Sequence, residues 1–227
     1  PQNYTLTGYM SPDPGDGKRH PAIIWLTGGD TNSLDDFWTP GPAENDQSAR
    51  AFREAGVVMA FVTLRGGNGH RSQREWFLGE VDDVLAAADQ LAQIAYVDSA
   101  QIYLGGHSTG GTLALLVAAA GGNFKAVFAL GPVASVDRYP QDIVPVDFAA
   151  HDPLELKLRS PINWLDDIRQ PTFVVEGTSS PSNIADLDAM CERSRNANLQ
   201  CLRVPDADHF SVIRRATLAI AAQLAGS

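Results

Sequence analysis

The sequence has no long hydrophobic run and an excess of acidic over basic residues. No apolar stretch reaches the ~20 residues that a membrane-spanning helix needs, and Leu113–Ala120 reads as a buried helix. Lys and Arg number 17 against 27 Asp and Glu, which gives a formal net charge of −10. An acidic surface gains nothing from binding nucleic acid or an anionic membrane. We therefore expect a soluble protein with no membrane span and no nucleic-acid partner.

Cysteine and histidine are scarce as well. Cys191 and Cys201 lie on a predicted helix and on the strand after it, where a disulfide or two thiols would fit, and we interpret them as reduced, half-buried thiols. The five histidines do not cluster with each other or with cysteine, so we expect no metal site. The stretch Gly105–Gly111 lacks the spacing of a dinucleotide fingerprint and the Lys of a phosphate loop. We expect no cofactor.

Strand-like and helix-like segments alternate along the whole chain. This alternation predicts a single α/β domain over residues 1–227, with a mostly parallel sheet covered by helices on both faces. The predicted strands are Tyr4–Met10, Ala22–Leu26, Val57–Thr63, Gln101–Leu104, Ala126–Leu130, Thr172–Glu176 and Leu199–Val204. The predicted helices are Asn45–Ala55, Gly79–Ile94, Thr109–Ala120, Ile184–Asn196 and Ser211–Leu224.

One segment interrupts the alternation. Between the strands that end at Leu130 and begin at Thr172, the chain carries too many prolines for one long helix. These are Pro132, Pro140, Pro145, Pro153 and Pro161. Long insertions inside a compact domain are usually functional or packed by their own side chains. We expect a small cap-like insertion of short helices and loops around residues 132–170.

The most informative motif is Gly106-His107-Ser108-Thr109-Gly110. It is a Gly-x-Ser-x-Gly pentapeptide, and it stands between an apolar strand and a run of helix formers. Such a turn is tight, and glycines on either side of the serine avoid collisions with neighbouring backbone. The pattern in this setting predicts a nucleophile elbow with Ser108 as the nucleophile.

A serine nucleophile requires a base that takes its proton. His209 follows the last predicted strand and precedes the C-terminal helix, so its loop emerges at the same edge of the sheet as Ser108. We interpret His209 as the general base, and His107 as a side chain that packs beneath the turn. The other histidines are His20 before a strand, His70 in a Gly-rich loop and His151 in the cap.

The oxyanion of an acyl-transfer reaction needs hydrogen-bond donors, which two backbone positions can supply. Thr109 begins a helix, where backbone N–H groups lack partners. Thr27-Gly28-Gly29-Asp30 follows a strand, and its paired glycines let the backbone approach a substrate carbonyl. We expect the N–H groups of Thr109 and Gly29 to form the oxyanion hole, with Asp30 as the alternative to Gly29.

Taken together, these pieces resemble the α/β-hydrolase superfamily and, within it, the prolyl-oligopeptidase-like and dienelactone-hydrolase-like branch. The matching segments cover nearly the whole chain: His20–Gly29, Leu64–Gly69, Gly79–Val84, Tyr96–Asp98, Gly106–Gly110, Ser160–Asn163, Pro171–Thr178 and the His209 loop. The resemblance implies the α/β-hydrolase fold, a Ser-acid-His order and acyl transfer on esters or peptides without a cofactor. Ser108 excludes the cysteine nucleophile of the dienelactone type.

The sequence departs from this pattern at the acid. Relatives place an aspartate about three residues past the glycine of Val175-Glu176-Gly177-Thr178, and this chain has Ser180 there. Glu176 ends the same strand, and its longer side chain recovers part of the reach, so we interpret Glu176 as the acid. Asp186, Asp137 and the absence of any acid remain the alternatives. The oxyanion loop departs too, with Thr27 where relatives carry histidine.

We therefore expect a serine hydrolase that cleaves small carboxylic esters or short peptides through an acyl-enzyme on Ser108. A ligand-binding protein that keeps the fold but has lost its acid is the alternative. An exopeptidase would need an acidic anchor for the substrate ammonium, which Glu75 or Asp36 could supply. The candidate lining residues of the substrate pocket are Phe37, Trp38, Trp76, Phe77 and Tyr139.

Overall fold

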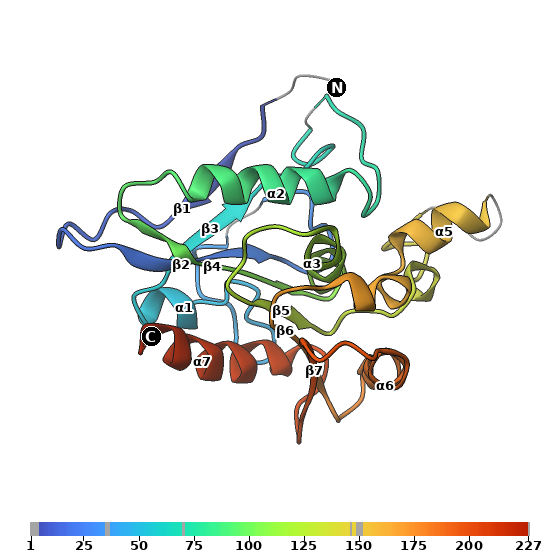
Figure 1. Ribbon diagram of the computed structural model, residues 1–227. Coiled ribbons are helices and arrows are strands. Elements are labelled where there is room, and N and C mark those ends of the chain that lie inside the picture. The colour runs from blue at the N-terminus through green and yellow to red at the C-terminus, as the bar shows by residue number, and fades with distance from the viewer. Residues whose placement is uncertain (1–4, 35–36, 70, 146, 149–151, 227) are drawn as a thin grey trace.

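A seven-stranded sheet forms the centre of the computed structural model, which describes residues 5–34, 37–69, 71–145, 147–148 and 152–226 (Figure 1). The strand order is β1-β3-β2-β4-β5-β6-β7, and every neighbouring pair is parallel except the antiparallel pair β1 and β3. The mostly parallel sheet is thereby confirmed. The strands are β1 (Gly8–Met10), β2 (His20–Leu26), β3 (Val58–Val62), β4 (Val97–His107), β5 (Val127–Leu130), β6 (Thr172–Gly177) and β7 (Leu199–Val204).

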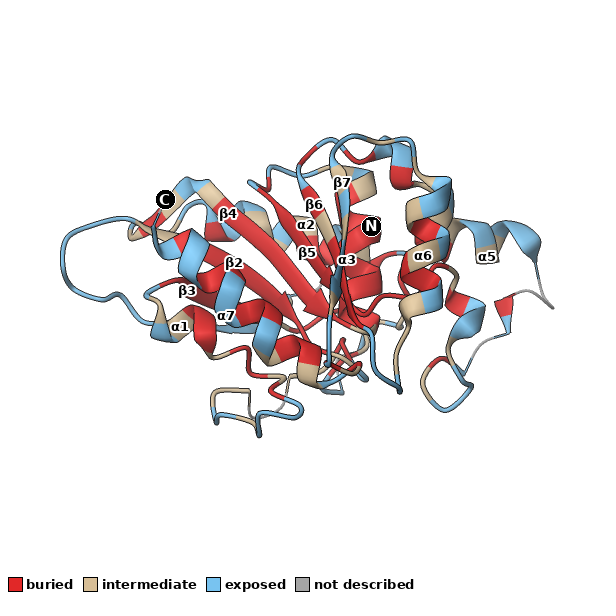
Figure 2. Cartoon of the chain, turned by 90° about the horizontal axis from the view of Figure 1, so that it is seen from below, coloured by how far each residue is buried: buried red, intermediate tan, exposed pale blue. Residues whose placement is uncertain are grey.

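Helices cover both faces of this sheet. Figure 1 shows α2 (Glu80–Leu91) and α3 (Thr109–Ala120) on one face, and α1 (Ala51–Glu54) and α7 (Ser211–Ala225) on the other. The helix α6 (Ile184–Arg193) lies beside β7 and contributes to the same core as α2 and α3. Figure 2 shows the strands buried along much of their length, while the helices turn exposed residues outward. Strands covered on both faces read as continuous apolar runs, which explains why β2 was recognisable in the sequence.

The segment before α1 differs most from the sequence expectation. A helix was predicted over Asn45–Ala55, but only the single turn of α1 is helical. The Asp46 carboxylate accepts hydrogen bonds from the Gly41 N–H at 3.2 Å and the Ser48 hydroxyl at 2.5 Å. Ala49 has φ +44°, outside the helical region. Side chains that bond to nearby groups compete with helix formation, and here they keep the backbone in turns.

Short elements fill the proline-rich segment between β5 and β6. They are the 3₁₀ turns η1 (Val136–Arg138), η2 (Pro161–Asn163) and η3 (Leu165–Asp167), and the helix α5 (Pro153–Arg159). Asp152 caps α5 by accepting a hydrogen bond from the Leu154 N–H at 2.8 Å. Figure 1 shows α5 beyond the end of the sheet, on the side of α3.

A disulfide joins Cys191 on α6 to Cys201 on β7. The interpretation of these residues as reduced thiols is therefore wrong for this structure. The helix packs next to the strand that follows it, which brings the two Cα atoms to 6.3 Å, within the range that a disulfide spans. Among the described helices, none combines the length and the hydrophobicity that crossing a bilayer requires.

Candidate active site

Ser108 lies in a sharp turn between β4 and α3, at the carboxyl edge of the sheet. Its backbone has φ +54° and ψ −115°, a conformation that is rare for a residue with a side chain. A Cβ on Gly106 would come within 2.5 Å of the Gly110 carbonyl, and a Cβ on Gly110 within 2.2 Å of the Leu26 oxygen. The two glycines of the pentapeptide are therefore required by close backbone contacts on both sides of Ser108.

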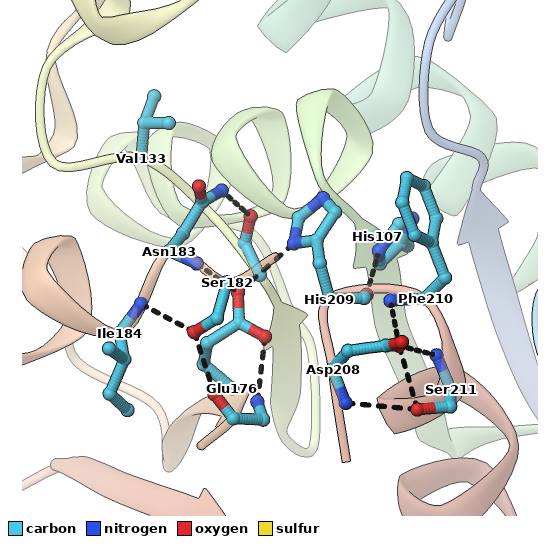
Figure 3. Close-up of polar contacts among 12 residues, drawn as sticks. His107, Val133, Glu176, Ser182, Asn183, Ile184, Asp208, His209, Phe210 and Ser211 are labelled. Atoms are coloured by element: carbon cyan, nitrogen blue, oxygen red, sulfur yellow. Dashed lines mark hydrogen bonds and ion pairs between the residues drawn. The ribbon is translucent and has the colours of Figure 1, made fainter. Parts of the chain in front are cut away.

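His209 and Glu176 form a buried pair at the same edge (Figure 3). The His209 Nδ1 atom lies 3.0 Å from the Glu176 Oε2 atom, and the carboxylate is fully buried. Glu176 also accepts hydrogen bonds from the backbone N–H groups of Gly177, at 2.6 Å, and Asn183, at 3.0 Å. A carboxylate can only accept, so the ring donates from Nδ1, and its Nε2 is left as a proton acceptor when the ring is neutral.

Gly131, at the end of β5, makes room for this pair. Its φ is +58°, and a Cβ there would lie 2.6 Å from the His209 Cε1 atom and 3.1 Å from the Glu176 Oε2 atom. Its carbonyl accepts a hydrogen bond from the Asn183 side chain at 2.9 Å. The long side chain of Glu176 and the missing side chain of Gly131 thus fit each other.

The other acids that the sequence left open lie elsewhere. Asp186 is buried and accepts a hydrogen bond from the Ala134 N–H at 3.0 Å, with Arg138 at 3.5 Å. Asp137 is exposed on η1, and so is Ser180 in the loop after β6. Of these carboxylates, the structure brings Glu176 to His209.

Three hydrogen bonds from backbone N–H groups hold the loop that carries His209. The His209 N–H donates to the Pro181 carbonyl at 2.7 Å, which joins this loop to the one after β6. The Asp208 carboxylate accepts from the N–H groups of Ser211 and Phe210 at 2.7 and 3.0 Å (Figure 3). The backbone hydrogen bond from Ser211 is the main reason that the pKa of Asp208 lies below its usual range.

Gly29 and Thr109 lie in contact beside Ser108. The Thr109 hydroxyl donates to the Gly29 carbonyl at 3.0 Å, and the Thr31 N–H donates to the same oxygen at 3.0 Å. Gly29 has φ +73°, a conformation that favours glycine. The neighbouring Gly28 approaches the turn so closely that a Cβ on it would lie 3.3 Å from the Ser108 Cβ atom.

Three of the five expected pocket aromatics lie on the α3 side of the sheet. Phe77 and Tyr139 stack with ring centroids 5.9 Å apart, and Trp76 packs in the same core. The Tyr139 hydroxyl bonds to the Thr112 hydroxyl at 2.7 Å and lies near the Ser108 side chain. Burial raises the pKa of Tyr139 far above its usual range, so this hydroxyl stays neutral.

Phe37 and Trp38 lie in a different place from the one the sequence suggested. Both pack against Phe61 of β3, with ring centroids 5.7 and 5.3 Å away, in the core on the α7 side of the sheet. Glu75 is paired with Arg65 at 2.5 Å. Asp36, His70 and His151 lie outside the described residues.

His107 is buried beneath the turn and bonds to the loop of His209. Its Nε2 atom lies 2.8 Å from the His209 backbone oxygen. Burial, together with the nearby His209, lowers the pKa of His107 to about 3, so this ring is neutral at physiological pH. His20 lies away from this edge of the sheet, because it begins β2 at the amino end of the strand. Its ring pairs with Asp16.

Sequence reasoning missed Gln47, whose side chain contacts both Gly28 and His107. Its partners are 19 and 60 residues away, so no local pattern marks it. Within the described parts of the chain, no group of three or more His, Cys, Asp and Glu residues is arranged to hold a metal ion.

The model of the prolyl oligopeptidase family matches residues 44–225, which is most of the chain. No curated protein matches this chain in sequence. Similarity at the level of the fold is extensive, and three solved structures illustrate it.

A 2,6-dihydroxy-pseudo-oxynicotine hydrolase superposes with a TM-score of 0.76 at 21% identity, over 97% of this chain and 64% of its own. A puromycin-hydrolyzing peptidase of Mycobacterium tuberculosis gives a TM-score of 0.77 at 19% identity, over 100% of this chain and 38% of its own. The enzyme Est1E of Butyrivibrio proteoclasticus, solved with ferulic acid, gives 0.69 at 16% identity, over 98% and 96%. The chain thus spans less than two thirds of the first two proteins.

Proposed function

Because the chain belongs to the prolyl oligopeptidase family, we propose that it is a serine hydrolase that cleaves carboxylic esters or short peptides through an acyl-enzyme on Ser108. Ser108 would be the nucleophile, His209 the general base and Glu176 the acid that orients it. The backbone N–H groups of Thr109 and Gly29 would bind the oxyanion. No metal or cofactor enters the reaction.

In the proposed reaction the His209 Nε2 atom accepts the Ser108 hydroxyl proton as Oγ attacks the substrate carbonyl carbon. The carbonyl electron pair moves to the oxygen, where the N–H groups of Thr109 and Gly29 stabilise the negative charge. When the tetrahedral intermediate collapses, the leaving alcohol or amine takes the proton from His209. Water then attacks the acyl-enzyme by the same route and releases the carboxylic acid.

The observation that carries the proposal is the buried His209–Glu176 contact of 3.0 Å at the sheet edge where Ser108 lies. A carboxylate at Nδ1 fixes the tautomer in which Nε2 can take a proton, and it stabilises the imidazolium that forms. Burying a carboxylate is costly even where partners offset part of the cost, so a buried carboxylate next to a histidine calls for a functional reason. General-base catalysis by His209 is such a reason.

The substrate class is proposed from the aromatic residues beside the site and from the structurally similar proteins. Trp76 and Phe77 line a small cavity together with Gly29 and Thr109, and Phe77 stacks on Tyr139, so aromatic side chains lie beside the proposed oxyanion hole. The structurally similar proteins are described as hydrolysing puromycin or as binding ferulic acid. Esters and amides of small, partly aromatic molecules are therefore the first substrates to test.

Replacing Ser108 by alanine tests the proposal. We expect S108A to lose hydrolysis of p-nitrophenyl acetate by on the order of 10⁴ to 10⁶ in kcat, the cost of removing a nucleophile. The thermal midpoint should stay close to that of the wild type, because the half-buried hydroxyl contributes little to the core. S99A, which removes an exposed hydroxyl from the opposite end of β4, is the matched control.

A fluorophosphonate probe separates catalysis from mere binding. Covalent capture requires an activated serine, so the wild type should be labelled at Ser108 and S108A should not. A folded wild-type protein that neither takes the label nor hydrolyses the ester would be a ligand-binding member of the fold. If S108A kept more than a tenth of the wild-type rate of ester hydrolysis, the nucleophile would be another residue.

A further inference from the structure

We infer that Gln47 is a positioning residue that fixes the oxyanion loop by linking it, through His107, to the loop of the general base. The inference rests on the proposed function, because it assigns a task within the same site. Among the described residues, the hydrogen bonds of Gln47 go neither to Ser108 nor to the side chain of His209. Its side chain instead joins Gly28 to the ring of His107.

Three hydrogen bonds form a continuous chain. The Gly28 N–H donates to the Gln47 Oε1 atom at 3.0 Å. The Gln47 Nε2 atom lies 2.9 Å from the His107 Nδ1 atom. The His107 Nε2 atom lies 2.8 Å from the backbone oxygen of His209. The chain therefore connects the loop after β2 with the loop before α7, which are far apart in sequence.

The chemistry of the partners fixes the direction of each bond. The His209 carbonyl oxygen can only accept, so the Nε2 atom of His107 carries a proton. The ring is neutral, which leaves its Nδ1 atom as an acceptor, and the Gln47 amide must donate to it with its NH₂ group. The Gln47 oxygen then faces the Gly28 N–H. One tautomer and one amide orientation satisfy all three contacts.

Gln47 is itself held firmly. Its backbone oxygen accepts a hydrogen bond from the Trp25 indole N–H at 3.1 Å, and its amide group also donates to the Asn45 side chain at 2.9 Å. Trp25 is buried in β2, the strand that leads into the oxyanion loop. These contacts explain why the backbone around Gln47 forms turns instead of the helix that the sequence predicts.

The consequence for catalysis lies at Gly28. Gly28 packs against the His107 ring, because a Cβ on Gly28 would come within 2.8 Å of the His107 Nδ1 atom. The bond to Gln47 fixes its peptide group, and Gly29, the proposed oxyanion donor, is the next residue. Oxyanion donors stabilise a transition state only when they are already oriented before the charge develops. Loss of Gln47 should therefore reduce kcat more than it affects KM.

The first test is Q47L, which removes both polar atoms and keeps the approximate volume. Deleting an oxyanion donor costs about 10² to 10³ in kcat, and a donor that is only misplaced should lose less. We expect kcat for p-nitrophenyl acetate to fall by about tenfold to a hundredfold, with KM within about twofold. Q93L is the matched control, because the exposed Gln93 amide donates to the Asp89 carbonyl at 3.1 Å, four residues earlier in the chain.

The second test is Q47E, whose side chain has nearly the same shape. One carboxylate oxygen can still accept from Gly28, but the other faces the His107 Nδ1 atom, which is also an acceptor. That contact is favourable only while a proton is shared between the two groups, and the proton is lost as pH rises. The kcat of Q47E should therefore fall on the alkaline side, where the wild type stays level.

The outcomes separate this inference from the proposed function. Full kcat in folded Q47L, or a Q47E profile parallel to that of the wild type, would overturn the role of Gln47 while leaving Ser108 labelling intact. Absence of labelling and hydrolysis in the wild type would overturn the proposed function and this inference with it. If Q47L does not fold, Q47E alone decides through its pH profile.

Discussion

At the scale of single residues, the least usual feature is the source of the acid. Glu176 stands at the end of β6 rather than in the loop beyond it, and its carboxylate reaches His209 because Gly131 leaves the space open. The backbone N–H groups of Gly177 and Asn183 hold the carboxylate in place. In the proposed triad, a glutamate at the end of β6 would thus supply the carboxylate, and the glycine that follows β5 would leave the room it needs.

Glu176 can be tested by an isosteric change. E176Q keeps the shape of the side chain, but its NH₂ group can face the His209 ring and support the wrong tautomer. We expect kcat to fall by about 10³ to 10⁴, the scale of an acid-to-amide change in a Ser-His-Asp triad, with little change in KM. Steady-state hydrolysis of p-nitrophenyl acetate measures this.

The control for E176Q is E192Q, which makes the same change on an exposed face of α6. D186N makes the corresponding carboxylate-to-amide change at Asp186, which is also buried. Should E176Q keep full activity and D186N lose it, the acid would be Asp186. Full activity in both would leave a Ser-His dyad.

At the scale of secondary structure, the sequence predicts best where a segment is buried on both faces. The buried helix Thr109–Ala120 matches its prediction residue for residue, and the buried strands β2 and β6 nearly match theirs. The strand Leu199–Val204 is an exception, because it also matches although it lies at the edge of the sheet and alternates between exposed and half-buried residues over most of its length. β4 is longer than expected, because Gly105 and Gly106 continue the strand and pair with Trp25 and Leu26. These glycines read as a break, yet the buried Trp25 ring occupies the space that a side chain at Gly105 would fill.

The residues of the candidate site also differ in how clearly the sequence marks them. Ser108 and His209 could be proposed from the sequence because each lies in a short motif at the end of a strand. Gln47 could not, because its proposed role depends on Gly28 and His107, which only the folded chain brings to it. The prediction of a helix over Asn45–Ala55 is wrong at its first residues. The side chains of Asp46 and Gln47 there form hydrogen bonds with neighbouring and distant groups, and the backbone forms turns.

The disulfide between α6 and β7 gives a prediction about stability. It closes a short loop, with a sequence separation of 10, and restricts the unfolded chain. The loop-entropy relation gives about 2 to 3 kcal/mol for a loop of this length. We expect C191A/C201A, and the wild type under reductant, to lose this amount of unfolding free energy in urea titrations.

The rate of ester hydrolysis should change little in the same samples, because neither cysteine contacts the proposed catalytic residues. The double variant under reductant is the control, since it has no bond to reduce. Equal urea midpoints for oxidised and reduced wild type would show that the disulfide contributes nothing to stability.

At the scale of the whole molecule, the formal charge of −10 sets the electrostatic field around the site. A negative field attracts cationic substrates, and salt screens that attraction. We expect kcat/KM for acetylthiocholine to fall by about threefold to tenfold between 0.02 and 0.5 M NaCl. The neutral isostere 3,3-dimethylbutyl thioacetate should change by less than about 1.5-fold. Parallel salt dependence of the two substrates would contradict this.

The fit between Gly131 and the His209–Glu176 pair has a consequence for substitution at this position. A Cβ at Gly131 would lie 2.6 Å from the His209 Cε1 atom and 3.1 Å from the Glu176 Oε2 atom. The backbone φ of +58° is also one that residues with a side chain rarely adopt. Any side chain at Gly131 would therefore push the imidazole ring away from the carboxylate, so we expect glycine alone to be compatible with this contact.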